Sequence, residues 1–183
     1  MKKKHTLFIV LAIFSIIAAS LGITIAYLVS QSGEVENTFT VGDVSIVLTE
    51  SHAERYLMLP GTDIPKNPTI TVDAVSDACW LFFKIDESSD FDRYMTYTPE
   101  EGWSALSGES NLYYREVNTS KNNQHFPLLT ENKVSVKDTV TEEELDALDN
   151  KPYLTFTAYA IQRTEIPTPE LAWELMMKEM EGQ

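Results

Sequence analysis

After residue 37, the chain consists mainly of short stretches in which hydrophobic and polar residues alternate, separated by glycine, proline and asparagine. Alternation with a period of two is typical of β-strands that bury one face. Residues 78–85, "ACWLFFKI", are instead apolar almost throughout, which predicts a short strand covered on both faces. The pattern also assigns strands to residues 38–50, 69–73, 111–117, 132–138 and 152–162. We therefore expect an all-β fold, in the form of a jelly-roll-like β-sandwich with short loop helices.

The alternation slips by one residue within the first of these strands. Phe39 and Val41 share one face, whereas Val44, Ile46 and Leu48 have the other parity. A bulge or tight turn at the Gly-Asp pair between the two groups would account for the slip.

Two helices are expected among the strands. Thr141 and Glu144 form a capping box ahead of "EEELDAL", and Asn150 can end that helix. A second helix is predicted over residues 168–180, where a proline follows the capping Thr168. Its apolar stripe consists of Leu171, Ala172, Leu175 and Met176. Packing against the sheet is the favoured role of this stripe, and binding of a partner is the alternative.

The N-terminus has the layout of an export signal. Three lysines precede residues 7–29, a stretch of 23 residues without a charge. Small residues before the Ala26–Tyr27 bond predict a cleaved signal peptide over residues 1–26, followed by a polar arm over residues 27–37. The stretch is also long enough to remain as a membrane anchor, which is the alternative. In both cases the rest of the chain lies outside the cytoplasm, and only the N-terminal segment meets the membrane.

The part that remains after cleavage is strongly acidic. The whole chain has a formal charge of −14, from 14 basic and 28 acidic residues. Residues 1–26 contain three lysines and no acidic residue, so cleavage leaves 11 basic and 28 acidic residues, a formal charge of −17. Such a surface repels nucleic acid and anionic lipid, so neither is expected as a partner. Residues 38–183 are long enough for one β-sandwich domain with a packed core.

Sequence motifs for catalysis are lacking. The chain has no His-Glu-x-x-His, no serine in a nucleophile elbow and no glycine-rich phosphate loop. Its one cysteine, Cys79, lies in the apolar strand, where a buried and inert thiol is expected. We therefore expect no catalytic residue, no cofactor and no resident metal.

Three further groups of residues are weaker candidates for binding sites. His52 and His125 could hold a metal if the fold brought them together, although solvated surface histidines are commoner. The acidic residues of 86–92 could bind calcium, but a solvated loop is favoured because the spacing is not that of an EF-hand. Trp103 with Tyr113 and Tyr114 could form a platform for sugars, but packing in the core or against neighbouring strands is favoured.

Several stretches together resemble one known family. They are "ITIAYLVSQSGEVENTFTVGDVSIVLTE", "LMLPGTDIPKNPTITVDAVSDACWLFFKI", "GWSAL", "YYREV", "PLL" and "LTFTAYAIQ". Over residues 21–162 the chain resembles the TasA/camelysin (CalY) family of exported proteins of Gram-positive bacteria. The most specific part is the junction, an apolar run that ends in Ala-Tyr, a polar segment and then "NTFTVGDVSIVL".

The resemblance implies a function outside the cell. It implies processing at Ala26–Tyr27 by a signal peptidase of the SipW type and a jelly-roll domain at the cell surface or in the biofilm matrix. Its partners would be further copies of itself or related matrix subunits, joined into fibres by N-terminal strand donation. The candidate donated strand contains Phe39, Val41, Val44, Ile46 and Leu48.

Other functions stay open at this stage. The candidate strand could complete the sheet of its own chain instead of that of a neighbour. Some camelysin-like members are described as cell-surface metallopeptidases, which is the enzymatic alternative. A monomeric surface adhesin or accessory module is the other alternative, and it predicts a soluble ligand without a polymer.

Overall fold

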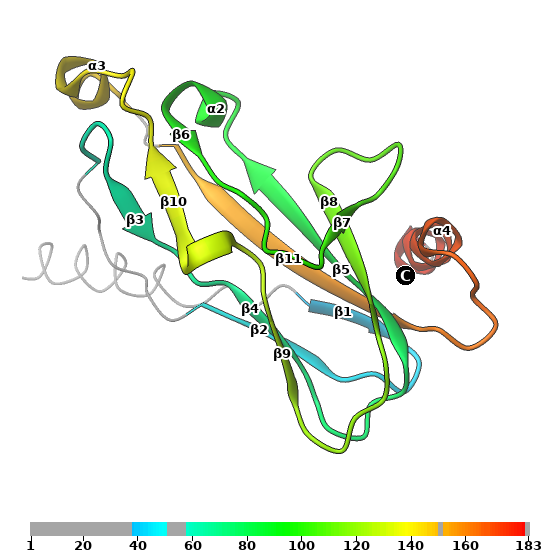
Figure 1. Cartoon of the computed structure of the whole chain (residues 1–183). Coiled ribbons are helices and arrows are strands. Elements are labelled where there is room, and N and C mark those ends of the chain that lie inside the picture. The colour runs from blue at the N-terminus through cyan, green and yellow to red at the C-terminus, as the bar shows by residue number, and fades with distance from the viewer. Residues whose placement is uncertain (1–37, 51–57, 150–151, 182–183) are drawn as a thin grey trace, which may run out of the picture. The chain divides into compact units, whose positions relative to one another are not determined.

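The computed structural model describes residues 38–50, 58–149 and 152–181 (Figure 1). The chain divides into one unit over Met1–Val35 and a second over Glu36–Gln183. All described residues belong to the second unit, and the fold is that of this unit alone.

Several predictions concern residues outside the described ranges. They are the signal segment 1–26, the Ala26–Tyr27 cleavage site, the arm 27–37 and His52. Among the described residues, no helix is long and apolar enough to span a bilayer.

A five-stranded sheet forms one layer of the unit, with the strand order β1-β11-β5-β8-β7. Its members are β1 (Thr38–Val41), β11 (Leu154–Gln162), β5 (Cys79–Glu87), β8 (Leu112–Val117) and β7 (Ser104–Ala105). β1 runs parallel to β11, and the other neighbours are antiparallel. The long strands β5 and β11 pair along their whole length and form the centre of the sheet.

Two three-stranded antiparallel sheets form the facing layer. One contains β2 (Ile46–Thr49), β4 (Thr69–Val72) and β9 (Gln124–Pro127), and the other contains β3 (Asp63–Pro65), β10 (Lys133–Val136) and β6 (Met95–Thr96). The 3₁₀ turn η1 (Thr130–Asn132) connects β9 to β10. The backbone hydrogen bond from Lys66 to Asn132 (2.7 Å) extends the pairing of β3 with β10, and that from Leu128 to Pro68 (3.0 Å) extends the pairing of β4 with β9.

The main core lies between these two layers. Leu81 and Phe83 of β5 point into it, whereas Trp80 and Phe82 point to the opposite face of the five-stranded sheet. β5 is therefore buried on both faces, as its continuous apolar sequence predicts. On β11 the predicted core face is also confirmed, and it consists of Leu154, Phe156, Ala158 and Ala160. The all-β class is confirmed, because the described residues form mainly strands and few helices.

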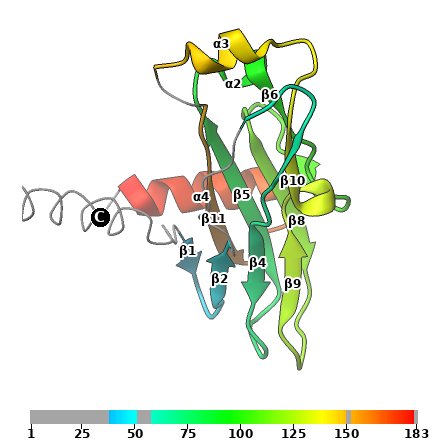
Figure 2. The ribbon, with the colours of Figure 1, turned by 90° about the vertical axis from the view of Figure 1, so that its left-hand side faces the viewer.

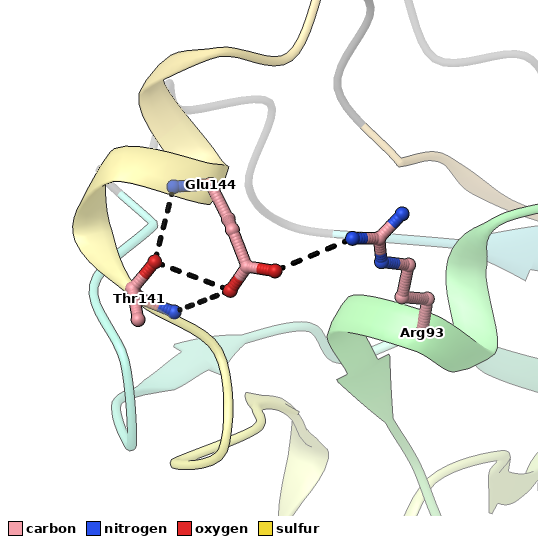
Figure 3. Close-up of polar contacts among 3 residues, drawn as sticks. All are labelled: Arg93, Thr141 and Glu144. Carbon is pink, nitrogen blue, oxygen red and sulfur yellow. Dashed lines mark hydrogen bonds and ion pairs between the residues drawn. The ribbon is translucent and has the colours of Figure 1, made fainter.

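Two short helices lie at the ends of strands, α2 (Phe91–Tyr94) and α3 (Glu142–Asp146). The predicted capping box at the start of α3 is present, since the Thr141 side chain accepts from the Glu144 N–H and the Glu144 carboxylate accepts from the Thr141 N–H (Figure 3). Glu144 also pairs with Arg93 of α2 at 3.3 Å (Figure 3). These bonds, above all those from Thr141, lower the pKa of the Glu144 carboxyl. α3 ends at Asp146, so it is shorter than expected.

The helix α4 (Pro169–Glu181) covers the other face of the five-stranded sheet and crosses behind its strands (Figure 2). Packing against the sheet, the favoured role of this helix, is confirmed. The predicted stripe is wrong in part, because Leu171 and Leu175 are about two-fifths exposed, at 37% and 40%. The buried face consists of Pro169, Ala172, Trp173 and Met176.

Four short strands fall outside the ranges predicted from the sequence, namely β3, β6, β7 and β9. β6 and β7 have two residues each, too few to produce an alternating pattern. β3 lies in the proline-rich stretch 59–68 and forms an edge of its sheet, where proline is tolerated.

Candidate functional site

The candidate donated segment forms two strands in different layers. β1 belongs to the five-stranded sheet and β2 to the facing layer. The chain turns between them at Gly42, where φ is +84° and the Val44 N–H donates to the Gly42 carbonyl at 2.9 Å. A Cβ atom at Gly42 would lie 2.7 Å from Gln162 Oε1, so both the dihedral and the space require glycine. The tight turn expected from the slip in parity is confirmed.

The five candidate residues have different environments. Phe39 is 46% exposed and stacks on Tyr159 of β11, with 5.4 Å between ring centroids. Val41 is partly buried against the aromatic cluster beneath α4. By contrast, Val44, Ile46 and Leu48 are buried in the main core of their own unit. The segment thus completes its own sheets here, and donation between copies stays a prediction.

Among the described residues, β1 covers only half of the β11 edge of the five-stranded sheet. β1 pairs with residues 158–161 of β11, and no strand among the described residues pairs with residues 154–157 on that side. The Ser88 N–H donates to the Tyr153 carbonyl, so Thr155 and Thr157 also direct their backbone groups toward β5.

It follows that Leu154 and Phe156 direct their N–H and C=O groups away from β5. These groups lie on the side of β11 that pairs with β1, at positions that precede its first pair, Thr38 with Ala158. We name residues 154–157 of β11 the open edge. Its flanking side chains include Tyr153, which is 57% exposed, and the exposed Thr155.

The terminal strand β1 has little of the usual protection against pairing with another chain. Its sequence, "TFTV", has no charge and no proline. Natural sheets commonly protect their edges with lysine, proline or a bulge. Within the described part of the chain, β1 and the open edge together therefore form a sheet margin without charged residues.

The candidate metal ligands are dispersed. His125 is exposed, and its Nδ1 lies 2.9 Å from the Thr71 hydroxyl. In the acidic stretch 86–92, Asp86 and Glu87 end β5, Asp90 precedes α2 and Asp92 lies within it. Within the part of the chain that the structure describes, no three His, Cys, Asp or Glu side chains are grouped so that they could hold a metal ion.

Packing, the favoured role of Trp103, Tyr113 and Tyr114, is confirmed, and the three rings do not form a shared platform. Tyr113 and Tyr114 lie on opposite faces of β8, because Tyr113 stacks on Phe83 at 4.9 Å whereas Tyr114 contacts Trp80 at 6.0 Å. Trp103 contacts the edge of Phe83, with 4.7 Å between ring centroids.

The guanidinium carbon of Arg115 lies over two aromatic rings, 5.1 Å from the centroid of Trp103 and 4.3 Å from that of Phe126. The Trp103 indole N–H also donates to the Pro127 carbonyl at 2.8 Å. The aromatic and guanidinium groups therefore pack together on the side of the sandwich between β8 and β9, and Trp103 is half-buried there.

Cys79 is buried at the start of β5, as expected. Burial raises the pKa of its thiol to about 12, against an ordinary value of 9.0. The thiol is protonated at neutral pH, so Cys79 is a packing residue rather than a nucleophile.

Sequence reasoning missed the open edge. The alternation of residues 152–162 predicts the strand but not its neighbours, since pairing is set by residues far away in the chain.

Comparison of the chain with models of known protein families, with curated proteins and with solved structures finds no match.

Proposed function

We propose that this protein is a secreted structural protein of the cell surface or extracellular matrix that assembles into fibres by strand donation. The open edge carries the proposal, because Leu154 and Phe156 direct their backbone groups to a side without a described strand. A strand added there would gain main-chain hydrogen bonds and join two copies. Donor and acceptor surfaces differ, so the contact is heterologous and extends into a filament.

The proposal takes the two-layered fold as a jelly-roll-like β-sandwich. The chain passes repeatedly between the layers, from β1 to β2, from β4 to β5 and from β8 to β9. Such crossings between facing sheets are typical of jelly rolls and other Greek-key folds.

The donor in this proposal is the arm, residues 27–37, freed when a signal peptidase of the SipW type cuts at Ala26–Tyr27. The arm directly precedes β1, which forms the terminal strand beside the open edge. Resemblance to the TasA/camelysin family supports the same assignment. We place the donated residues ahead of β2, because Val44, Ile46 and Leu48 fill the core of their own unit.

Two single-cysteine variants test the donation. A donated arm that takes the place of β1 on β11, in the register of β1, would place its position 35 opposite Thr155 of the other copy. A sample of Val35→Cys protein is mixed with a sample of Thr155→Cys protein under mild oxidation. A disulfide between position 35 and position 155 can then form only between copies, and we expect dimers on non-reducing gels. The native Cys79 does not compete, because it is buried.

The matched control replaces Thr155→Cys by Glu142→Cys, an exposed position on α3. Mixed dimers no more abundant than in this control would overturn the donation. A variant carrying both cysteines shows whether the arm pairs with its own chain. A crosslink confined to single chains would make the segment part of its own sheet.

Processing and assembly are measured on protein recovered from cells that express the full chain. N-terminal sequencing should find Tyr27 as the first residue of the secreted form. Sedimentation velocity over a range of concentrations should find large species that grow with concentration. A monomer at every concentration would contradict the fibre proposal and favour an adhesin or accessory module.

A further inference from the structure

A cleft of about 460 Å³ lies between α4 and the loop that joins β7 to β8. Three apolar side chains form its floor, Leu106 from the loop and Trp173 and Met177 from the helix. Trp173 is held in place by edge contact with Tyr159 at 5.1 Å and by Phe82 at 5.5 Å. The floor is therefore fixed by the packing of α4 on the sheet, and the cleft is formed before anything binds.

The rim of the cleft is acidic. Glu109 lies on the loop side, and Glu170, Glu174 and Glu181 lie along the helix, with Lys178 as the one basic residue. The ion pairs among the described residues use other carboxylates, those of Glu50, Asp63, Glu116, Glu131 and Glu144. The four rim carboxylates thus have no cationic partner within the described unit.

The charges of this rim are only partly compensated within α4, where Lys178, one turn after Glu174 and in the last turn, is the one cation on the cleft. Glu170 and Glu174 are one turn apart, where like charges repel each other. Glu181 is the last residue of α4, close to the negative end of the helix dipole, where a carboxylate is unfavourable. Glu170 alone, in the first turn, is favoured by the dipole. A cationic partner along the cleft would relieve these repulsions.

We propose that the cleft binds a peptide segment in which lysine or arginine residues flank one or two large apolar side chains. The apolar side chains would pack on Leu106, Trp173 and Met177, and the cations would reach the four carboxylates. The rim runs from Glu170 to Glu181, about 16 Å along the helix axis, which matches an extended segment of about five residues. A small inorganic cation would fill little of a cleft of about 460 Å³ and would not contact its apolar floor, so a peptide fits both features.

The test is calorimetric titration of the protein, recovered from cells that express the full chain, with acetyl-Lys-Lys-Leu-Phe-Lys-Lys-amide. Two further peptides serve as probes, one with Gly-Ser in place of Leu-Phe and one with glutamate in place of lysine. We expect binding of the first peptide, weaker binding of the Gly-Ser peptide by about fivefold or more, and none of the acidic peptide. Equal affinity for the first two would reduce the effect to general attraction by an acidic protein and overturn the site.

Variants locate the site. Glu170→Gln combined with Glu174→Gln should weaken binding about fivefold, and Met177→Lys should weaken it further, because it places a cation in the floor. The matched control, Glu142→Gln with Glu143→Gln on α3, removes the same charge and should leave the affinity within about twofold. Thermal unfolding checks that each variant is folded.

Two outcomes would overturn this inference, and the cysteine crosslink distinguishes them from failure of the fibre proposal. One is that the cleft variants, Glu170→Gln with Glu174→Gln and Met177→Lys, bind the peptide with the same affinity as the control variant. The other is that the cleft variants lose concentration-dependent self-association. The cleft would then bind a second copy of this chain instead of a basic peptide. The cysteine crosslink at position 155 reports on the open edge separately.

Discussion

At the scale of single residues, Cys79 and Arg115 are reactive or charged side chains that lie in apolar surroundings. Cys79 is fully buried, and Arg115 is enclosed by two aromatic rings with no carboxylate partner among the described residues. Burial lowers the pKa of the Arg115 guanidinium. Both residues therefore contribute through packing, as the apolar surroundings of each indicate.

The Cys79 thiol gives a prediction about pH. Its raised pKa means that the unfolded chain loses this proton before the folded chain does, so its contribution to stability is present below pH 9 and is lost as pH rises toward 12. The free energy of unfolding should fall by up to about 1.4 kcal/mol per pH unit in that range because of this thiol.

Urea titrations at several pH values, compared with those of Cys79→Ala, measure the contribution. The difference between the two proteins should shrink as pH rises above 9. Native Cys79 should also resist thiol reagents at pH 8 until the protein is unfolded. A thiol that reacts in the folded protein at the rate of the unfolded one would contradict its burial.

Arg115 gives a second prediction at this scale. Arg115→Ala removes both the cation–π contacts and the aliphatic stem over Trp103 and Phe126, so we expect a loss of about 1–2 kcal/mol in the free energy of unfolding. Arg115→Lys should recover only part of the loss, since an ammonium group cannot stack on both rings. Chemical denaturation measures both. Equal stability of wild type and Arg115→Ala would show that the contacts contribute nothing net.

At the scale of elements, the orientation of α4 shows what the sequence determines and what it does not. The apolar residues of the helix are correctly predicted to pack on the sheet. Which of them are buried depends on the partner surface, where Tyr159 and Phe82 accommodate the Trp173 ring. The broad ring displaces Leu171 and Leu175 toward solvent.

A pair of substitutions on α4 measures this difference. Trp173→Ala should lower the free energy of unfolding by about 3–5 kcal/mol, the usual effect of removing a buried tryptophan. Leu175→Ala, two residues further along the same helix, should change it by less than about 1 kcal/mol, because this side chain is 40% exposed. Urea denaturation followed by circular dichroism gives both values. Similar losses in the two variants would favour the stripe expected from the sequence.

One substitution in β1 and one in β2 test the two parts of the candidate donated segment. Ile46→Asp places a charge in the main core and should unfold the unit, with a loss of more than about 3 kcal/mol. Phe39→Asp changes a side chain that is 46% exposed, so the protein should stay folded. Reduced polymer in the Phe39→Asp variant, measured by sedimentation, would connect this margin with assembly. Unchanged polymer would exclude the Phe39 ring from the contact.

Much of the fold could be predicted from local patterns, and the rest depends on distant pairing. The long strands β5 and β11 are clear because an unbroken apolar run and a strict alternation extend over many residues. β6 and β7 exist only because Met95 and Ser104 meet partners elsewhere in the chain. The open edge and the α4 cleft were not predictable for the same reason, since each is formed where separate segments meet.

At the scale of the whole molecule, charge is the dominant property. With 28 acidic and 14 basic residues, the surface repels further copies of itself at neutral pH. The margin formed by β1 and the open edge has no such charge along its strands. In the proposed fibre, pairing at this margin would therefore have to overcome repulsion between the acidic surfaces.

Assembly should accordingly depend on salt and pH. Raising the salt concentration shortens the range of repulsion, and lowering the pH toward the isoelectric point of about 4.5 neutralises carboxylates, so both should favour polymer. Light scattering and sedimentation at several salt concentrations measure the effect. Assembly that responds to neither would show that carboxylate repulsion does not control it.

The pairing of β1 with β11 has a consequence for timing. Thr38 lies beside Ala158, so the two strands are separated by about 120 residues of chain. In a chain that crosses the membrane from its N-terminus, β1 emerges early and must wait for β11, which emerges almost last. Until then the first strand has no neighbour in its sheet, and the interval between their arrivals decides whether its first partner is its own chain or another molecule.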